Sequence, residues 1–300
     1  MGTTMSDLFD FKSRKRRYAV VGHPVLHSKS PQIHESFARQ CNVSLSYDAI
    51  ALDPIAFEQG VRNLQAGGVA GINVTLPFKE AAFRLADEVS ERAQFANAVN
   101  TVSFSGDDHI AGDNTDGIGL VRDLQENLGI ACTGARILII GAGGAARGIV
   151  QPLLQSNPDC VVIANRTVSR ARELVASMDS PDRVHPCGLD DVNEAFDLVI
   201  NATAASLSSQ VPALSESVFH PGSHAYDLAY ADQPTAFMRW ALGLGAVRAV
   251  DGLGMLVEQA AEAFWIWHGQ RPHTAPVISA LRSGCLLYTS PSPRDQRGSR

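Results

Sequence analysis

The sequence lacks the features that mark several common classes of protein. No run of about 18 apolar residues occurs, so we expect no membrane-spanning helix. The N-terminal residues have no apolar middle region, which argues against a secretory signal peptide. Lysine and arginine number 25 against 31 acidic residues, and the net charge of −6 argues against a nucleic-acid-binding protein.

Cysteine is scarce, and the spacing of the cysteines does not match a metal-binding motif. No CxxC pair occurs, so we expect neither a zinc ribbon nor a disulfide framework, and a reducing cytoplasm fits best. The chain has 300 residues and is 45% hydrophobic, which suits one large domain or two of ordinary size. The five cysteines are Cys41, Cys132, Cys160, Cys187 and Cys285.

The two ends of the chain differ in character from the rest. Residues 1–17 are predicted to be a leader, and their basic cluster at 14–17 is read as a solvated segment rather than a nucleic-acid contact. Residues 285–300 are rich in proline, serine and arginine and have no periodicity. Because CLLYTSPSPRD resembles a translated sequencing adapter, we expect this tail not to belong to the native chain.

The first part of the chain alternates short apolar runs with helical patterns. Ser30 and Pro31 predict a helix start, with the serine as N-cap and the proline at the first helical position. A helix is expected over 79–86, after Pro77. Strands are expected at 18–22, 47–52 and 71–78, followed by a hairpin of 98–104 with 109–114.

A second unit is expected to begin near Asp116. A helix through Leu120 and Leu124 leads to the run RILIIGAGGAARGIV, which is typical of a strand, a glycine-rich turn and a helix. Strands alternating with helices predict βαβ units and a doubly wound parallel sheet. Further strands are expected at 160–167, 196–203, 223–230 and 246–252, and helices at 169–178 and 253–268.

The glycine-rich turn matches the pattern G-x-G-x-x-A. Gly141 permits a tight turn, Gly143 permits the backbone to approach a pyrophosphate, and Ala146 permits close helix–sheet packing. The unpaired N–H groups of the following helix would face the phosphates. The sequence therefore predicts dinucleotide binding, with a glycine-rich turn that serves packing alone as the alternative.

The next strand indicates which dinucleotide is bound. An NAD site usually has a carboxylate at the end of this strand, where it binds the ribose 2′-hydroxyl. Here the strand ends in Asn165, Arg166 and Thr167, and Arg170 follows one helical turn later. Guanidinium groups pair with phosphate through charge-assisted hydrogen bonds. We therefore expect NADP rather than NAD, with a solvated basic turn as the alternative.

Three polar motifs of the first unit could carry chemistry. HSKSP (27–31) has two hydroxyls in a strand-to-helix loop, NVTLPFK (73–79) has Thr75 and Lys79 at a strand end, and GDNTDG (112–117) has two carboxylates. Each has an ordinary alternative, which is a helix cap, a surface lysine or a capping turn. The last motif lacks the ligand spacing of a calcium loop, so we expect no metal.

These residue types suit the oxidation of a secondary alcohol. A nicotinamide accepts the hydride, and the protein must exchange the hydroxyl proton and stabilise charge on the oxygen. A lysine can do both if its ammonium is partly desolvated or its proton is relayed. A neighbouring aspartate would act in the opposite sense, by holding the lysine charged and oriented. A polyol acid also needs hydroxyl and amide partners, and Ser28, Ser30, Thr75 and Asn100 are of the right types.

Over residues 18–283 the sequence closely resembles the shikimate dehydrogenase family. The matching stretches are VGHPVLHSKSP, GINVTLPFKE, AVNT, GDNTDG, GAGGAAR, NRTVSR, INAT and DGLGMLVEQA. The resemblance implies reversible, NADP-linked reduction of 3-dehydroshikimate to shikimate, in aromatic amino-acid biosynthesis. It also implies an α/β substrate domain, 18–116 completed by 253–283, and a Rossmann domain, 117–252, with a cleft between them.

The resemblance also implies roles for individual residues. Lys79 and Asp116 would be the catalytic pair, with Lys79 as acid and base. The substrate contacts would be Ser28, Ser30, Thr75, Lys79, Asn100, Asp116, Tyr230 and Gln259. The NADP contacts would be Gly141, Ala142, Gly143, Gly144, Ala145, Asn165, Arg166, Thr167, Arg170, Leu228 and Gly252.

Two departures from the family pattern and two alternative functions stay open. Ala204, Ala205 and Ser206 stand where the family often has a glycine-containing loop, and Leu228 stands where methionine is common. A quinate/shikimate dehydrogenase shares most of these motifs, and a non-catalytic NADP-binding sensor could use the same fold. The oligomeric state is also open, with a homodimer as one alternative.

Overall fold

The computed structural model describes residues 15–284 apart from 107, 179–180, 204 and 206–209. Most of the predicted leader and the whole tail, 285–300, lie outside the described residues, as do Ala204 and Ser206. Within the described residues, no helix is both long and apolar enough to cross a membrane.

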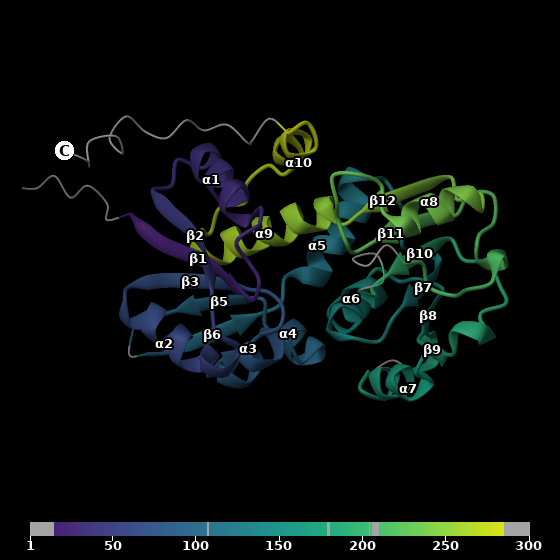
Figure 1. Cartoon of the computed structure of the whole chain (residues 1–300), viewed down its shortest axis with the longest axis horizontal. Helices are drawn as coiled ribbons and strands as arrows, with labels where there is room; N and C mark the ends of the chain where they lie inside the picture. Colours follow the sequence, from purple (N-terminus) through teal and green to yellow (C-terminus); the bar gives the residue numbers. More distant parts are fainter. Residues whose placement is uncertain (1–14, 107, 179–180, 204, 206–209, 285–300) are drawn as a thin grey trace, which may run out of the picture.

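The chain forms two sheets that lie side by side (Figure 1). The first is a mixed sheet in the order β2-β1-β3-β5-β6-β4, in which β1 runs parallel to β2 and β3 while β5 runs antiparallel to β3 and β6. The hairpin predicted over 98–114 is therefore confirmed. Its strands are β1 (Arg16–Gly22), β2 (Leu45–Ala51), β3 (Val69–Val74), β4 (Glu88–Val89), β5 (Thr101–Phe104) and β6 (Ile110–Asp113).

The second sheet is fully parallel, in the order β12-β11-β10-β7-β8-β9. The order reverses at the first strand of the unit, as in a doubly wound dinucleotide-binding sheet, so that prediction is confirmed. Its strands are β7 (Arg136–Ile140), β8 (Cys160–Ala164), β9 (Val184–Cys187), β10 (Leu198–Asn201), β11 (His224–Asp227) and β12 (Arg248–Asp251).

Helices cover both faces of both sheets, and α5 and α9 extend between them (Figure 1). The helix α5 continues into a π-helical segment, Asp123–Asn127. The α-helices are α1 (Ser30–Gln40), α2 (Phe57–Ala66), α3 (Lys79–Leu85), α4 (Glu91–Ala96), α5 (Asp116–Arg122), α6 (Gly144–Gln155), α7 (Val168–Ala176), α8 (Ala236–Gly243), α9 (Leu253–His268) and α10 (Ala275–Arg282). Short 3₁₀ helices span Pro54–Ala56, Pro181–Arg183, Leu189–Asp191 and Glu216–Val218.

Two hydrophobic layers enclose the first sheet. Alternation along β1 sends Tyr18 and Val20 to one face and Ala19 and Val21 to the other. The first face packs against α1, α9 and α10, and the second against α2, α3 and α4. We call this sheet with its helices, including the C-terminal α9 and α10, the first lobe. The second sheet with α6, α7 and α8 is the second lobe.

One buried histidine should make the first lobe sensitive to acid. His34 of α1 is fully buried and stacks on Tyr47, with 4.1 Å between ring centroids. Burial, together with the nearby His268, lowers the pKa of His34 from 6.5 to about 3. Between these two pH values the unfolded chain binds a proton at His34 that the folded chain does not, so folding stability falls as the pH falls.

We expect His34 to lower the free energy of unfolding by up to about 1.4 kcal/mol for each unit by which the pH falls, which is the linkage slope for one proton. Urea titrations between pH 8 and pH 4 measure it. A His34→Phe variant keeps an aromatic ring against Tyr47 and should show a shallower dependence by that amount. Near pH 8 the free energies of unfolding of the two proteins should change with pH in the same way. Equal dependence of these free energies on pH below pH 6 would contradict the low pKa of His34.

Glycines let α5 approach the helices on either side of it. A Cβ at Gly117 would lie 2.4 Å from the carbonyl oxygen of Gly148 and 2.4 Å from Pro152 Cγ, both in α6. A Cβ at Gly119 would lie 2.8 Å from the Gln259 backbone nitrogen in α9. The start of α5 is therefore held between the second lobe and α9, which places Asp116 where the two lobes meet.

We expect Gly117→Ala to lower the free energy of unfolding by about 1–3 kcal/mol, the usual cost of overpacking a close contact. The backbone of Gly148 cannot move aside as a flexible side chain could. Gly243→Ala is the matched control, because no heavy atom of the described residues lies within 4 Å of a Cβ there. That control should be neutral or slightly stabilising. Urea unfolding compares the two, and equal stability of both variants would contradict the contact.

One predicted helix cap is wrong. Ser30 is the first residue of α1 rather than its N-cap, and Lys29 occupies the cap position without a side-chain hydrogen bond. The hydroxyl of Ser28 instead accepts a hydrogen bond from the backbone N–H of Ser30 at 3.2 Å. The serine hydroxyl that accepts from the helix end therefore comes from two residues earlier. Pro31 is the second residue of the helix, one position later than predicted, because the helix already begins at Ser30.

Candidate active site

Lys79 and Asp116 meet where the first lobe faces the second. Lys79 begins α3 and Asp116 begins α5, and Lys79 Nζ donates to Asp116 Oδ2 at 2.6 Å. The lysine side chain is 27% exposed and that of the aspartate 13%, so the ammonium can reach both solvent and a ligand. A Cβ at Gly148 of α6 would lie 3.8 Å from Asp116 Cβ, so the pair lies next to the second lobe.

Asn100 orients the carboxylate of Asp116. Its Oδ1 accepts hydrogen bonds from the backbone N–H of Thr115 at 2.9 Å, from the hydroxyl of Thr115 at 3.1 Å and from that of Thr101 at 2.9 Å. These donors fix which way the amide points. Its Nδ2 therefore faces Asp116 Oδ1 and donates to it at 2.8 Å.

Gln259 extends this network from α9. Its Oε1 lies 3.5 Å from Asn100 Nδ2 and 3.4 Å from Thr115 Oγ1, and its Nε2 donates to the carbonyl of Leu256 at 2.8 Å. The structure thus connects Lys79, Asp116, Asn100 and Gln259 through hydrogen bonds, although they lie far apart in the sequence.

Asn73 is a residue that the sequence analysis did not select. It lies buried at the end of β3 and accepts a hydrogen bond from the Tyr47 hydroxyl at 2.6 Å. Its Nδ2 donates to the Asn100 carbonyl at 3.2 Å and to Thr101 Oγ1 at 3.1 Å. A polar residue inside the apolar run GINV was the one available signal.

The proposed hydroxyl contacts lie at the same edge of the first sheet. Thr75 follows β3, and its backbone N–H donates to the Val21 carbonyl of β1 at 2.9 Å. Ser28 lies in the loop after β1 and donates from Oγ to Ser30 Oγ at 3.1 Å. Because β1 and β3 are neighbouring parallel strands, their carboxyl ends present these side chains together. No hydrogen bond given for the described residues joins either serine directly to Lys79 or Asp116.

Tyr230 follows β11 of the second sheet but packs on the hydrophobic core of the first lobe. Burial raises its pKa above the ordinary value, so its hydroxyl stays protonated near neutral pH. Leu228 and Gly252 lie just after β11 and β12. A Cβ at Gly252 would lie 2.3 Å from the Leu228 carbonyl oxygen, so only glycine fits this close approach.

The glycine-rich turn fits a dinucleotide pyrophosphate. Gly141 has a φ of +109°, in the region that favours glycine, and Gly143 is the N-cap of α6 without a side-chain cap. A Cβ at Gly143 or Gly144 would meet no heavy atom of the described residues within 4 Å. Packing therefore does not explain these two glycines. They leave open space over the N-terminus of α6, where N–H groups can bind phosphate.

Arg166 and Arg170 lie at the carboxyl end of β8 and the start of α7, and both are exposed. No ion pair given for the described part of the chain includes either guanidinium. Asn165 Nδ2 donates to the Thr167 carbonyl at 2.8 Å and so shapes the turn that carries Arg166. The carboxyl ends of β7, β8, β11 and β12 thus gather all the proposed cofactor residues at one edge of the parallel sheet.

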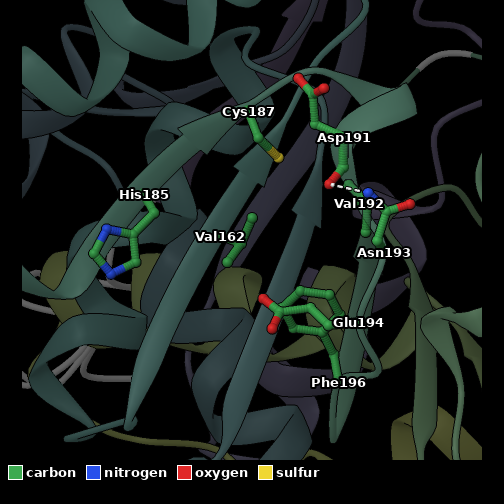
Figure 2. Close-up of a pocket in the computed structure, with 8 residues that line it drawn as sticks. All are labelled: Val162, His185, Cys187, Asp191, Val192, Asn193, Glu194 and Phe196. Atoms are coloured by element: carbon green, nitrogen blue, oxygen red, sulfur yellow. Dashed lines mark hydrogen bonds between the residues drawn. The ribbon is translucent and has the colours of Figure 1, made fainter.

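A cavity of about 500 Å³ lies elsewhere in the second lobe, against β8 and β9 (Figure 2). It is lined by His185 and Cys187 of β9 and by Asp191 and Glu194, and Glu194 pairs with Arg136 at 2.5 Å. Burial, and then the nearby carboxylates, raises the pKa of the Cys187 thiol, so it is a poor nucleophile. None of the predicted site residues lines this cavity.

Comparison with known proteins identifies the family of this chain. Residues 20–102 match the family model described as the shikimate dehydrogenase substrate binding domain, 123–218 match that of shikimate / quinate 5-dehydrogenase, and 252–282 match that of the shikimate 5′-dehydrogenase C-terminal domain. The chain belongs to the shikimate dehydrogenase family.

Individual relatives match most of the chain. The shikimate dehydrogenase (NADP⁺) of Methylococcus capsulatus is 53% identical over 89% of this chain and 96% of its own length. The crystal structure of an Ael1 enzyme from Pseudomonas putida has a TM-score of 0.85 at 46% identity, over 89% of this chain and 98% of that one. The Thermus thermophilus shikimate 5-dehydrogenase in complex with NADP(H) and shikimate has a TM-score of 0.79 at 34% identity, covering 89% and 99%.

Proposed function

We propose that this chain is an NADP-dependent shikimate dehydrogenase, which reduces 3-dehydroshikimate to shikimate reversibly. The observation that carries the proposal is the 2.6 Å contact between Lys79 and Asp116 next to the second lobe. The names of close relatives support the reaction and the cofactor.

Lys79 is proposed to be the acid and base of this reaction. In the reductive direction its ammonium donates a proton to the substrate carbonyl oxygen, and in the oxidative direction the amine accepts the hydroxyl proton. Asp116 holds Nζ in place through Oδ2, while Asn100 holds the other carboxylate oxygen. The partial exposure of Lys79 lets it exchange its proton with solvent.

Substrate orientation is proposed to come from the side chains around this pair. Thr75 and the serines of the loop after β1 supply hydroxyls, and Gln259 supplies an amide from α9. Tyr230, which packs on the hydrophobic core of the first lobe, is proposed to lie near the substrate ring. The Gly141–Ala145 turn and the Asn165–Arg170 segment, with Leu228 and Gly252, are proposed to hold the cofactor. When bound, NADPH would supply the hydride for reduction, and NADP⁺ would accept it in the reverse direction.

We also propose the domain division predicted from sequence, with 18–116 and 253–283 as the substrate domain and 117–252 as the cofactor domain. Packing of α9 and α10 on β1 and α1 supports the return of the chain to the first lobe. A cytoplasmic location is proposed from the free thiols of the described cysteines, Cys41, Cys132, Cys160 and Cys187.

An absorbance assay at the nicotinamide band tests the function. Shikimate and quinate are each offered with NADP⁺ and NAD⁺, and we expect shikimate with NADP⁺ to give the highest kcat/KM. Faster quinate oxidation with NAD⁺ would instead indicate a quinate/shikimate dehydrogenase. NADPH binding without turnover on either substrate would indicate a non-catalytic sensor.

A further inference from the structure

A cluster of ion pairs lies where α4, the end of β6 and α9 meet. Arg92 of α4 donates from Nε and Nη2 to the two carboxylate oxygens of Asp113 at 2.6 and 2.8 Å, and from Nη1 to Glu262 Oε1 at 3.0 Å. Glu262 also pairs with Arg122 of α5 at 3.3 Å and with Arg271 at 2.6 Å. One guanidinium thus connects three elements of the fold.

Asp113 connects this cluster to the proposed catalytic carboxylate. Its Oδ1 accepts a hydrogen bond from the backbone N–H of Asn114 at 2.7 Å, and Asn114 Oδ1 accepts one from the backbone N–H of Asp116 at 3.1 Å. Asn114 is itself held by a bond to the Ala98 carbonyl at 3.0 Å. A chain of hydrogen bonds therefore runs from Arg92 through Asp113 and Asn114 to the backbone of Asp116.

Glu262 connects the same cluster to the substrate side of α9. It lies one turn after Gln259, whose amide reaches Asn100 and Thr115. By binding both Asp113 and Glu262, Arg92 holds the turn that carries Asp116 against the helix that carries Gln259.

Apolar packing around the cluster is incomplete. A cavity of about 620 Å³ lies beside it, lined in part by Phe95, Ile118, Pro152 and Trp265. Burial tends to raise the pKa of Asp113, but the hydrogen bonds and charge of Arg92 hold it below its usual value, so the pair stays ionised at neutral pH. The Arg92 and Asp113 side chains are partly buried, at 26% and 19% exposed. Both exposed and buried ion pairs add little net stability, because screening or desolvation offsets their attraction, which favours a geometric role for this one.

We propose that Arg92 is a positioning residue, whose clamp on Asp113 and Glu262 sets the position of Asp116 relative to Gln259. The proposal rests on the proposed function of Lys79 and Asp116. Arg92 acts through the turn and the helix that it holds, without contacting the reacting atoms.

The substitution Arg92→Lys keeps the positive charge but loses the bidentate hydrogen bonds to Asp113. We expect kcat for shikimate oxidation to fall about tenfold, because small displacements of a catalytic group are costly, while the KM for NADP⁺ stays within about twofold of wild type. Amide hydrogen exchange over 114–116 should become faster. The matched control is Arg62→Lys, since Arg62 bonds to Gln65 and the Asp108 carbonyl within the first lobe, and both readouts should stay at wild-type values.

An Asp116→Asn background separates positioning from general destabilisation. If Arg92 acts through Asp116, Arg92→Lys should lower the residual kcat by less than about twofold there, since coupled sites are not additive. A full tenfold loss in both backgrounds would overturn the proposal, as would wild-type kcat and exchange in Arg92→Lys. If wild type itself does not oxidise shikimate, the proposed function fails. Amide hydrogen exchange over 114–116 then tests whether Arg92 holds this turn. Faster exchange in Arg92→Lys than in wild type would support the positioning role, and unchanged exchange would overturn it.

Discussion

Lys79→Ala is expected to lower kcat for shikimate oxidation by at least about 10²-fold, the usual scale for loss of a general acid–base group. The variant removes the amine that lies 2.6 Å from Asp116, and with it the group proposed to exchange the hydroxyl proton. The KM for shikimate should change less than kcat, because hydroxyl and amide partners from several elements remain. Steady-state absorbance kinetics in both directions measure the two effects.

Lys15→Ala is the matched control, since Lys15 is exposed next to β1 and lies outside the site. Its kcat should equal that of wild type. Circular dichroism and urea unfolding of both variants establish that the fold is intact. Full turnover by folded Lys79→Ala would mean that this lysine is a surface charge that happens to touch Asp116.

The second sheet was predictable because each of its strands is indicated by the residues of that strand and the turn that follows it. β7 and β8 are short apolar runs closed by turn residues, as expected for strands buried on both faces. Gly141 needs its positive φ and Gly143 its open surroundings, so the motif predicted both the turn and the ligand. In a parallel sheet the carboxyl ends of the strands share one edge, so the sequence alone predicts that Arg166 lies near the glycines.

The first sheet was less predictable because part of it depends on tertiary packing. The strand β4 has two residues, Glu88 and Val89, and α4 has six, so neither shows a usable periodicity. Arg92 lies in α4 and reaches Glu262 across 170 positions of sequence. No local pattern indicates such a contact, so the ionic cluster emerged only from the coordinates.

The candidate site was predicted in its residue types rather than in its contacts. A lysine at a strand end and an aspartate in a turn each had an ordinary structural explanation, and only the resemblance to a family joined Lys79 to Asp116. The hairpin of β5 and β6 makes the connection physically, by returning the chain to the edge where β3 ends. Asn73 was missed because a strand interior is usually assigned to the core.

Cofactor choice should depend on Arg166. Arg166→Ala is expected to raise the KM for NADP⁺ by at least about tenfold, or about 1.4 kcal/mol, because it removes the charge-assisted contact proposed for the 2′-phosphate. The KM for NAD⁺ should change little, since NAD⁺ has no such phosphate. The preference for NADP⁺ over NAD⁺, measured as a ratio of kcat/KM values, should therefore fall by the same factor. Removing Arg170 as well should lower it further, because that guanidinium lies one helical turn away.

Arg172→Ala is the matched control for this prediction. Arg172 is exposed on α7 like Arg170, but it lies two positions further along, on a different side of the helix. If only the general positive charge of α7 mattered, all three arginines would contribute alike, and each loss would weaken NADP⁺ binding in a salt-dependent manner. A specific 2′-phosphate contact predicts that Arg172→Ala keeps wild-type cofactor preference while Arg166→Ala loses it. Unchanged preference in Arg166→Ala would mean that another part of the chain selects the cofactor, despite the missing carboxylate at the end of β8.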